Sequence, residues 1–181
     1  MEGMVTLTTE RLVLREWRDE DAGPLYELAS DAAVGPAAGW PQHRDERESM
    51  YIIQTVLRRP DSYAVTFKGD GSLVGAIAFK DHSSSDLVQG DSERELGYWI
   101  GRPYWGRGFA TEAVRAMLAY GRDELCLSCI WAGHYAGNLA SRRVMEKCGL
   151  SYVRTRAGVP VPLLGPDVLR DEDLLVLEFG S

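Results

Sequence analysis

The fold is decided by the stretch Glu95-Leu96-Gly97-Tyr98-Trp99-Ile100-Gly101-Arg102-Pro103-Tyr104-Trp105-Gly106-Arg107-Gly108-Phe109-Ala110-Thr111-Glu112. It predicts a strand over 95–100, a turn that contains two glycines, and a helix that begins directly after it. The first N–H groups of a helix have no partner within the helix, and the helix dipole favours negative charge there. Glycines also remove the Cβ atoms that would keep a phosphate away from the backbone. The stretch therefore predicts a cradle for a pyrophosphate group.

Taken alone, Gly106 and Gly108 favour a simpler interpretation, in which they only shape a turn. The run is not G-x-G-x-x-G and lacks the Gly-Lys-Ser/Thr of a P-loop, so a dinucleotide site and a nucleoside triphosphate site are both excluded. Three arginines nearby make the segment locally basic: Arg102, Arg107 and Arg115, against Glu112.

A second segment, Asn138-Leu139-Ala140-Ser141-Arg142-Arg143-Val144-Met145-Glu146-Lys147-Cys148-Gly149-Leu150, predicts a helix closed by Gly149 in the left-handed conformation. Asn138 and Ser141 are three residues apart, so they share the first turn of that helix. An asparagine at this place is an ordinary N-cap. The capping role can coexist with a role in a site.

The rest of the chain supplies the other layers. Its periodicity predicts strands over 11–16, 62–68, 72–80, 125–132, 151–156 and 173–179, helices over 19–30 and 43–59, and loops over 31–42 and 81–93. This order is a mixed α/β (α+β) layer architecture rather than an alternating repeat. The length of 181 residues fits a single domain over residues 1–181.

Composition narrows the class of partner. The formal net charge is -7, and an acidic surface repels phosphate backbones and anionic lipid, so we expect neither nucleic acid nor a membrane as partner. A cationic or neutral acceptor fits this charge better. No apolar run approaches the roughly 20 residues that span a bilayer, and residues 1–11 do not resemble a signal peptide. We expect a cytoplasmic protein, and the sequence leaves a homodimer open.

The three cysteines are Cys126, Cys129 and Cys148, an odd number that suits reduced thiols. Cys126 and Cys129 lie within the predicted strand, where residues three apart point to opposite faces. No second Cys pair or His pair completes a zinc site. We therefore expect core thiols and no metal.

Together, the segments resemble the GNAT superfamily of N-acetyltransferases, and most closely the branch of the ribosomal-protein N-terminal (alanine) acetyltransferases. The resemblance is strongest from Glu95 to Leu150 and covers most of the chain in element order. Its strings are Gly97-Tyr98-Trp99-Ile100, Tyr104-Trp105-Gly106-Arg107-Gly108-Phe109-Ala110-Thr111-Glu112-Ala113, the 138–150 segment and the opening Thr9-Glu10-Arg11-Leu12-Val13-Leu14-Arg15. These strings are specific for the superfamily and uninformative about the acceptor.

The resemblance implies a three-layer domain, in which helices flank a mixed, splayed sheet and acetyl-CoA lies between the strands that end near Ile100 and Ala132. The pantetheine would pair with the backbone of Trp99, Ile100 and Gly101. Asn138 and Ser141 would face the thioester. The pyrophosphate would rest on the N–H groups of Trp105, Gly106, Arg107, Gly108, Phe109, Ala110 and Thr111.

The resemblance determines the catalytic groups less well than the cofactor-binding residues. Many relatives carry a tyrosine acid where this chain has Met145, and a thioether cannot donate a proton. Ser141 and Tyr135 are the candidates to protonate the leaving thiolate. Glu95 is the first candidate for the base that deprotonates the acceptor, and His134 is the second.

The expected reaction is transfer of an acetyl group to a primary amine, either a protein N-terminus or a small amine, by direct attack. The loop 35–43, with Trp40, and the segment 81–91 are expected to border the acceptor groove, with Trp40 a packing anchor rather than a substrate contact. One alternative is a coenzyme-A-binding sensor or subunit without catalysis. Another is a structural or interaction protein that binds no coenzyme A.

Overall fold

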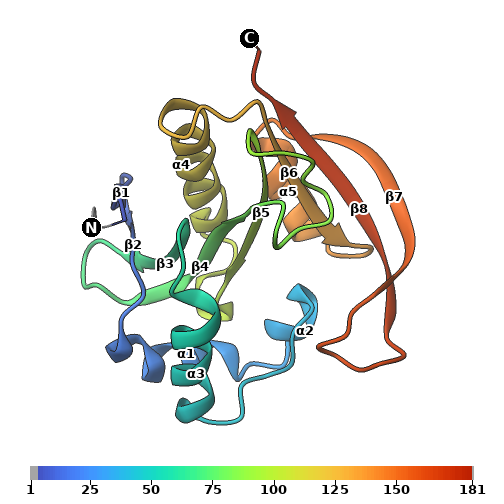
Figure 1. Cartoon of the computed structure of the whole chain (residues 1–181). Helices are drawn as coiled ribbons and strands as arrows, with labels where there is room; N and C mark the ends of the chain where they lie inside the picture. Colours follow the sequence, from blue (N-terminus) through green and yellow to red (C-terminus); the bar gives the residue numbers. More distant parts are fainter. Residues whose placement is uncertain (1–3, 181) are drawn as a thin grey trace.

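The computed structural model describes residues 4–180, so Met1–Gly3 and Ser181 of the predicted domain lie outside the described residues. Eight strands form one sheet in the order β1-β2-β3-β4-β5-β6-β8-β7 (Figure 1). Their bounds are Leu7–Thr8 (β1), Leu12–Arg15 (β2), Ser62–Phe67 (β3), Leu73–Lys80 (β4), Glu93–Ile100 (β5), Cys129–Tyr135 (β6), Ser151–Pro160 (β7) and Leu169–Glu178 (β8). Neighbouring strands pair antiparallel, except that β5 and β6 pair in parallel.

The helices are Ala22–Ala29 (α1), Gly35–Ala38 (α2), Glu46–Ile52 (α3), Phe109–Asp123 (α4) and Leu139–Lys147 (α5). Short 3₁₀ turns cover Asp19–Asp21 (η1) and Arg102–Tyr104 (η3), and a π-turn over Ile53–Leu57 (η2) continues α3. No helix within residues 4–180 is long and apolar enough to cross a membrane.

Two apolar clusters hold these helices on opposite faces of the sheet. On one face, Val114 and Met117 of α4 pack with Leu14, Ile77 and the other inward residues of β2 to β5. Alternate strand residues such as Ala64 and Ala76 face the other way and pack with α1 and the α3 segment. The period-2 pattern of the strands thus builds the three-layer architecture that the sequence predicts.

The structure differs from the sequence prediction in the loop 31–42, which contains the short helix α2. Pro36 falls at its first turn, where the missing N–H costs nothing, and Gly39 closes it with φ 92°. The last two strands, β7 and β8, are also longer than predicted. β7 extends to Pro160 and β8 starts at Leu169, because the two strands remain paired past the predicted ends.

The prediction for Cys126 is wrong. β6 begins only at Cys129, and Cys126 is exposed in the preceding turn with φ 51°. Cys129 is buried, as expected. The apolar run that predicts a strand from residue 125 instead folds Leu127 against α4, where its N–H donates to the Gly121 carbonyl.

Candidate functional site

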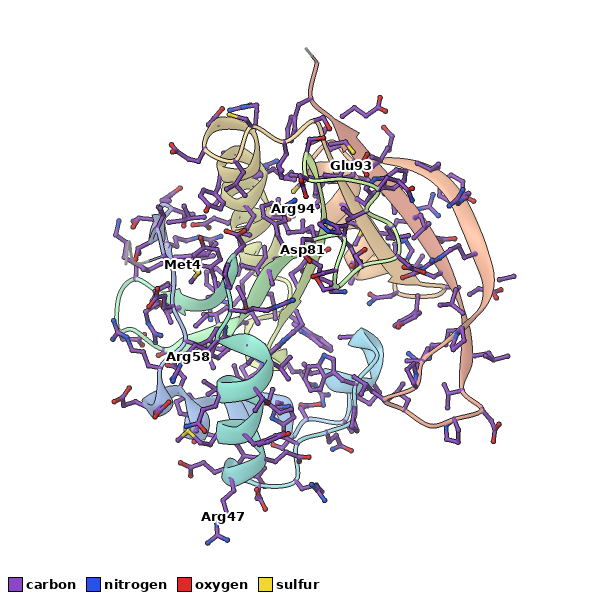
Figure 2. The ribbon with its side chains drawn as sticks, in the orientation of Figure 1. Met4, Arg47, Arg58, Asp81, Glu93 and Arg94 are labelled. Atoms are coloured by element: carbon purple, nitrogen blue, oxygen red, sulfur yellow. The ribbon has the colours of Figure 1, made fainter. Side chains whose placement is uncertain are left out.

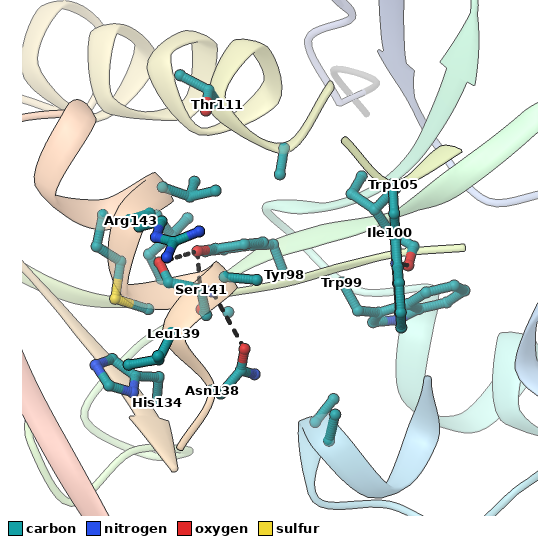
Figure 3. Close-up of a pocket in the computed structure, with 18 of the residues that line it drawn as sticks. Tyr98, Trp99, Ile100, Trp105, Thr111, His134, Asn138, Leu139, Ser141 and Arg143 are labelled. Carbon is teal, nitrogen blue, oxygen red and sulfur yellow. Dashed lines mark hydrogen bonds between the residues drawn. The ribbon is translucent and has the colours of Figure 1, made fainter. Parts of the chain in front are cut away.

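A cleft opens where the sheet splays between β5 and β6. The parallel pairing of the two strands runs from Glu93 opposite Cys129 to Leu96 opposite Ala132 and stops there. Beyond this point β5 continues with β4, and β6 continues with β8. The space between the diverging ends is a cavity of about 690 Å³ that α4 and α5 border on one side and α2 on the other (Figure 3). This size is ordinary for a ligand site.

The hydrogen-bond pattern of β5 leaves backbone groups free in this cleft. The N–H of Gly101 donates to the Val74 carbonyl at 2.8 Å, so alternate residues back along β5, including Trp99, direct their backbone groups at β4. Tyr98 and Ile100 therefore direct theirs at the opening. Of the three residues expected to pair with pantetheine, Ile100 directs its N–H into the cleft. The Trp99 backbone faces β4, and the Gly101 N–H and carbonyl are already paired with Val74 and Tyr104.

The glycine turn that precedes α4 adopts left-handed geometry. Gly106 has φ 72° and Gly108 has φ 79°, and a Cβ on Gly106 would project into open space. The N–H of Trp105 already donates to the Arg102 carbonyl, so this predicted donor is not available. The first intrahelical bond of α4 runs from Glu112 to Gly108. The N–H groups of Phe109, Ala110 and Thr111 consequently have no helical partner.

Trp105 contributes its side chain instead. Its indole Nε1 donates to the Ile100 carbonyl at 2.6 Å, and the ring stands about half exposed at the end of β5 (Figure 3). The bond fixes the turn against the strand and occupies one of the backbone groups that face the cleft.

An ion pair anchors the other side of the turn. The Glu112 carboxylate accepts from the Thr9 hydroxyl at 2.6 Å, from the Arg11 N–H at 2.8 Å and from the Arg11 guanidinium at 2.7 Å. Arg11 also donates to the Arg107 carbonyl at 3.0 Å. Burial opposes ionisation of Glu112, but these hydrogen bonds and the Arg11 charge outweigh it and lower its pKa. The strand opening 9–15 thus holds the start of α4 in place.

Three cations lie in or beside the cleft. Arg143 and Lys147 lie one turn apart on α5 and line the cavity, and Arg107 lies over the rings of Tyr104 and Phe109. Within the described part of the chain, none of these three cations forms a salt bridge. Unpaired positive charge in a chain of net charge -7 favours an anionic ligand in the cleft.

Asn138 and Ser141 occupy the first turn of α5, as predicted. The Asn138 side-chain oxygen accepts from the Ser141 N–H at 3.1 Å, which is an N-cap bond. The Tyr98 hydroxyl lies within hydrogen-bond distance of two Ser141 oxygens, Oγ at 2.9 Å and the backbone carbonyl at 3.1 Å (Figure 3). Burial raises the pKa of Tyr98 to about 12, although the Ser141 bond opposes the shift. Tyr98 was not predicted as a site residue.

Glu95 lines the cleft but is not a free carboxylate. Its Oε1 accepts from Lys80 Nζ at 2.8 Å, and its side chain is 14% exposed. The register of β4 and β5 makes this pair, because Lys80 lies directly opposite Glu95. Figure 2 shows the neighbouring residues Asp81, Glu93 and Arg94 at this end of the two strands.

His134 is buried, with a side chain only 2% exposed. Its Nδ1 donates to the Tyr135 carbonyl at 3.1 Å, and its Nε2 lies 3.8 Å from an Asp173 carboxylate oxygen. Among the described residues Nε2 has no hydrogen-bond partner and negligible accessible surface. This placement argues against direct proton transfer from an acceptor to His134, the second candidate for the base.

The other end of the cleft is bordered by Val34, Ala37 and Ala38 on and before α2. Arg170 of β8 holds this helix in place, since it donates to the Pro36 carbonyl at 2.6 Å and lies over the Tyr135 ring. Tyr135 also lines the cleft, and burial raises its pKa.

Trp40 packs edge-on against Trp99, with ring centroids 5.5 Å apart, in agreement with its expected role as an anchor. The segment 81–91 does not line the cavity within the described chain. It contacts β7 instead, through the Asp86–Arg156 pair. Its expected place at the border of the acceptor groove stays a prediction.

Over residues 4–180 we find no group of three His, Cys, Asp or Glu side chains that could hold a metal ion.

Comparison with known proteins places these features in context. Residues 11–151 match the family described as "Acetyltransferase (GNAT) domain". The chain is 30% identical over 148 residues to the "Uncharacterized N-acetyltransferase YoaA" of Bacillus subtilis, covering 79% of this chain and 81% of that protein. It is 25% identical over 147 residues to the "Ribosomal-protein-serine acetyltransferase" of Escherichia coli, covering 77% and 71%. The crystal structure of a GNAT-family acetyltransferase from Bacillus anthracis matches with a TM-score of 0.83 at 25% identity, covering 96% and 98%.

Proposed function

Because the chain belongs to the GNAT acetyltransferase family, whose members use acetyl-CoA, we propose that it transfers the acetyl group to a primary amine in the cleft between β5 and β6. The acceptor is a protein N-terminus or a small amine, and its nitrogen attacks the thioester directly. We also propose that residues 1–181 form one N-acetyltransferase domain.

The observation that carries the proposal is the splay of β5 from β6. It leaves the backbone groups of Tyr98 and the N–H of Ile100 facing the cavity, next to a turn whose glycines allow close approach. An extended pantetheine has amides that suit such a strand edge. Donors already fixed in the cleft can also hydrogen-bond the acetyl oxygen as it gains charge.

The phosphate groups of acetyl-CoA are proposed to lie at the α4 end. Here the free N–H groups of Phe109, Ala110 and Thr111 combine with the helix dipole. The nearest carboxylate, Glu112, is neutralised by Arg11. Arg143 and Lys147 add positive charge along the wall.

The acceptor is proposed to enter from the α2 end, past Ala37 and Ala38. An α-amino group has a pKa of about 7.7–8.0 and must lose a proton before it attacks. Glu95 is the proposed base, directly or through water. Both Glu95 and His134 line the cavity, but the Nε2 of His134 is closed to solvent. Lys80 would hold the carboxylate in place.

The test is an incubation of the protein with acetyl-CoA and a panel of amines, with the products identified by mass spectrometry. The panel contains short peptides with different N-terminal residues, a polyamine, free amino acids and an aminoglycoside. We expect one class to be acetylated faster than the uncatalysed control. Binding of acetyl-CoA without any acetylated product would favour the non-catalytic sensor, and no binding at all would favour an interaction protein.

A further inference from the structure

We infer that Tyr98 is a positioning residue that acts through Ser141, so that the Ser141 hydroxyl presents its hydrogen to the sulfur that leaves when the acetyl group is transferred. The inference rests on the proposed function and adds a role that the family resemblance does not assign. It concerns two hydroxyl groups from elements 43 residues apart in the chain, brought to 2.9 Å inside the cleft.

The need for such a pair comes from residue 145. Met145 is buried at 1% exposure and offers only a thioether, which cannot donate a hydrogen. Ser141 lies one turn earlier on the same helix and lines the cavity. Its hydroxyl can donate only one hydrogen, which goes either to Tyr98 or into the cleft.

The 2.9 Å contact allows either hydroxyl to donate, and we assign the donor role to Tyr98. The phenol is the more acidic of the two hydroxyls and therefore the better donor, and its ring packs against the apolar core below the sheet. When Tyr98 donates to Ser141 Oγ, the Ser141 hydrogen is released to point into the cleft. Asn138 supports the arrangement, because its N-cap bond fixes the turn that carries Ser141.

The acetyl transfer needs no reactant beyond acetyl-CoA and the acceptor amine. The carbon–sulfur bond breaks, and its electron pair goes to sulfur. The Ser141 O–H gives its proton to that sulfur, Ser141 Oγ takes the proton of Tyr98, and the Tyr98 phenolate takes up a proton from solvent. The proton that the acceptor nitrogen loses balances the proton that the free thiol carries.

The structure also provides an alternative that can be separated by experiment. The backbone carbonyl of Ser141 lies 3.1 Å from the Tyr98 hydroxyl. If the single phenol hydrogen goes to this carbonyl instead of Oγ, Tyr98 is a plain tether for α5. In Ser141→Ala the backbone carbonyl remains and only the Oγ partner is lost. If Tyr98 is only a tether, Tyr98→Phe should lower kcat equally in the parent and in Ser141→Ala. If Tyr98 positions Ser141 Oγ, Tyr98→Phe should have no further effect in Ser141→Ala.

The experiment is a double-mutant cycle of Tyr98→Phe and Ser141→Ala, with acetyl-CoA as donor and hydroxylamine as acceptor. Hydroxylamine is small and unprotonated near neutral pH, so it depends little on the acceptor site or the base. The rate of thiol release and the Kd of acetyl-CoA are measured for each variant. Tyr120→Phe is the matched control, because it removes the hydroxyl of another buried tyrosine, which donates to Asp61 at 3.0 Å outside the cavity lining.

We expect Tyr98→Phe to lower kcat by about tenfold or more, with an unchanged Kd for acetyl-CoA. This loss is smaller than the roughly 10²- to 10⁴-fold typical of a group that itself transfers the proton, because Tyr98 acts through Ser141. In the Ser141→Ala background, Tyr98→Phe should have no further effect on kcat, and Tyr120→Phe should leave kcat unchanged. Equal losses in both backgrounds, or no loss, would overturn the inference. A parent protein that releases no thiol with hydroxylamine or any amine of the panel would overturn the proposed function and the inference with it.

Discussion

The carboxylate of Glu95 and the ammonium of Lys80 lie 2.8 Å apart across the β4–β5 pair, and both side chains line the cleft. The lysine is 38% exposed and the glutamate 14%, so the carboxylate is held in one orientation while its second oxygen is left for another partner. A proton acceptor at this position could take a proton from an amine, either directly or through water.

Glu95→Gln tests this role. We expect kcat/KM for the acceptor to fall most at low pH and to recover partly as pH rises, because solvent then deprotonates the amine without help. General bases typically contribute about 10²- to 10⁴-fold. The measurement is a pH–rate profile with one amine from the panel.

Glu93→Gln is the control for Glu95→Gln, since Glu93 lies two residues earlier on β5 and accepts from Trp131 outside the cavity. Parallel profiles of parent and Glu95→Gln, less than about threefold apart against the range expected of a general base, would exclude Glu95.

Gly108→Val tests the glycine turn. Its φ of 79° is unfavourable for valine, so the variant should lose stability, about 1–3 kcal/mol for such strain, as well as acetyl-CoA affinity. Gly71→Val is matched for strain: Gly71 has φ 78°, and a side chain there meets nothing within 4 Å. We expect similar losses in thermal stability for both variants. Only Gly108→Val should weaken acetyl-CoA binding by about tenfold or more, or 1.4 kcal/mol. Equal affinities in titration calorimetry would mean that the phosphates bind elsewhere.

Asn138→Ala separates capping from catalysis. Loss of the bond to the Ser141 N–H should cost about 1 kcal/mol of stability and also lower kcat, because Ser141 loses its fixed orientation. Asp45→Ala removes a comparable N-cap, which accepts from Glu48 at 2.8 Å on α3. It should cost similar stability with unchanged kcat. If the two variants have the same turnover per folded molecule, Asn138 only caps the helix.

Glu112→Gln should have a pH-dependent effect on stability. The pKa of Glu112 is lowered in the folded protein, so its ionised form stabilises the fold. This contribution is complete above the unfolded pKa, about 4.3 for glutamate, and is lost as pH falls through the folded pKa. The difference in unfolding free energy between parent and Glu112→Gln should therefore be largest near pH 7 and shrink below about pH 4. Denaturant titrations at several pH values measure it.

Glu146→Gln serves as the control for Glu112→Gln, because Glu146 pairs with Arg142 at about half exposure and exposed pairs contribute little. A difference for Glu112→Gln that does not change with pH would show that packing, not charge, holds the turn.

The sequence predicted what depends on local pattern. The strand–turn–helix around Gly106 and Gly108 and the N-cap at Asn138 follow from residues a few positions apart. The helix α2 was missed because glycine and proline dominate 35–39, where Pro36 in fact suits the first turn.

What the sequence could not predict depends on pairing between distant strands and helices. The Lys80–Glu95 pair follows from the β4–β5 register, and the burial of His134 from its place opposite Asp173 of β8. The contact between Tyr98 and Ser141 requires β5 and α5 to meet across the cleft. Alternation along 95–100 does give one usable signal, because it places Tyr98 and Ile100 on the same face.

The most direct test of the account is a crystal structure of the protein with coenzyme A. We expect the pantetheine between β5 and β6 against Tyr98 and Ile100, the pyrophosphate on the N–H groups at the start of α4, and the sulfur beside the Ser141 hydroxyl. Coenzyme A bound outside this cleft, or bound with its sulfur away from Ser141, would contradict it.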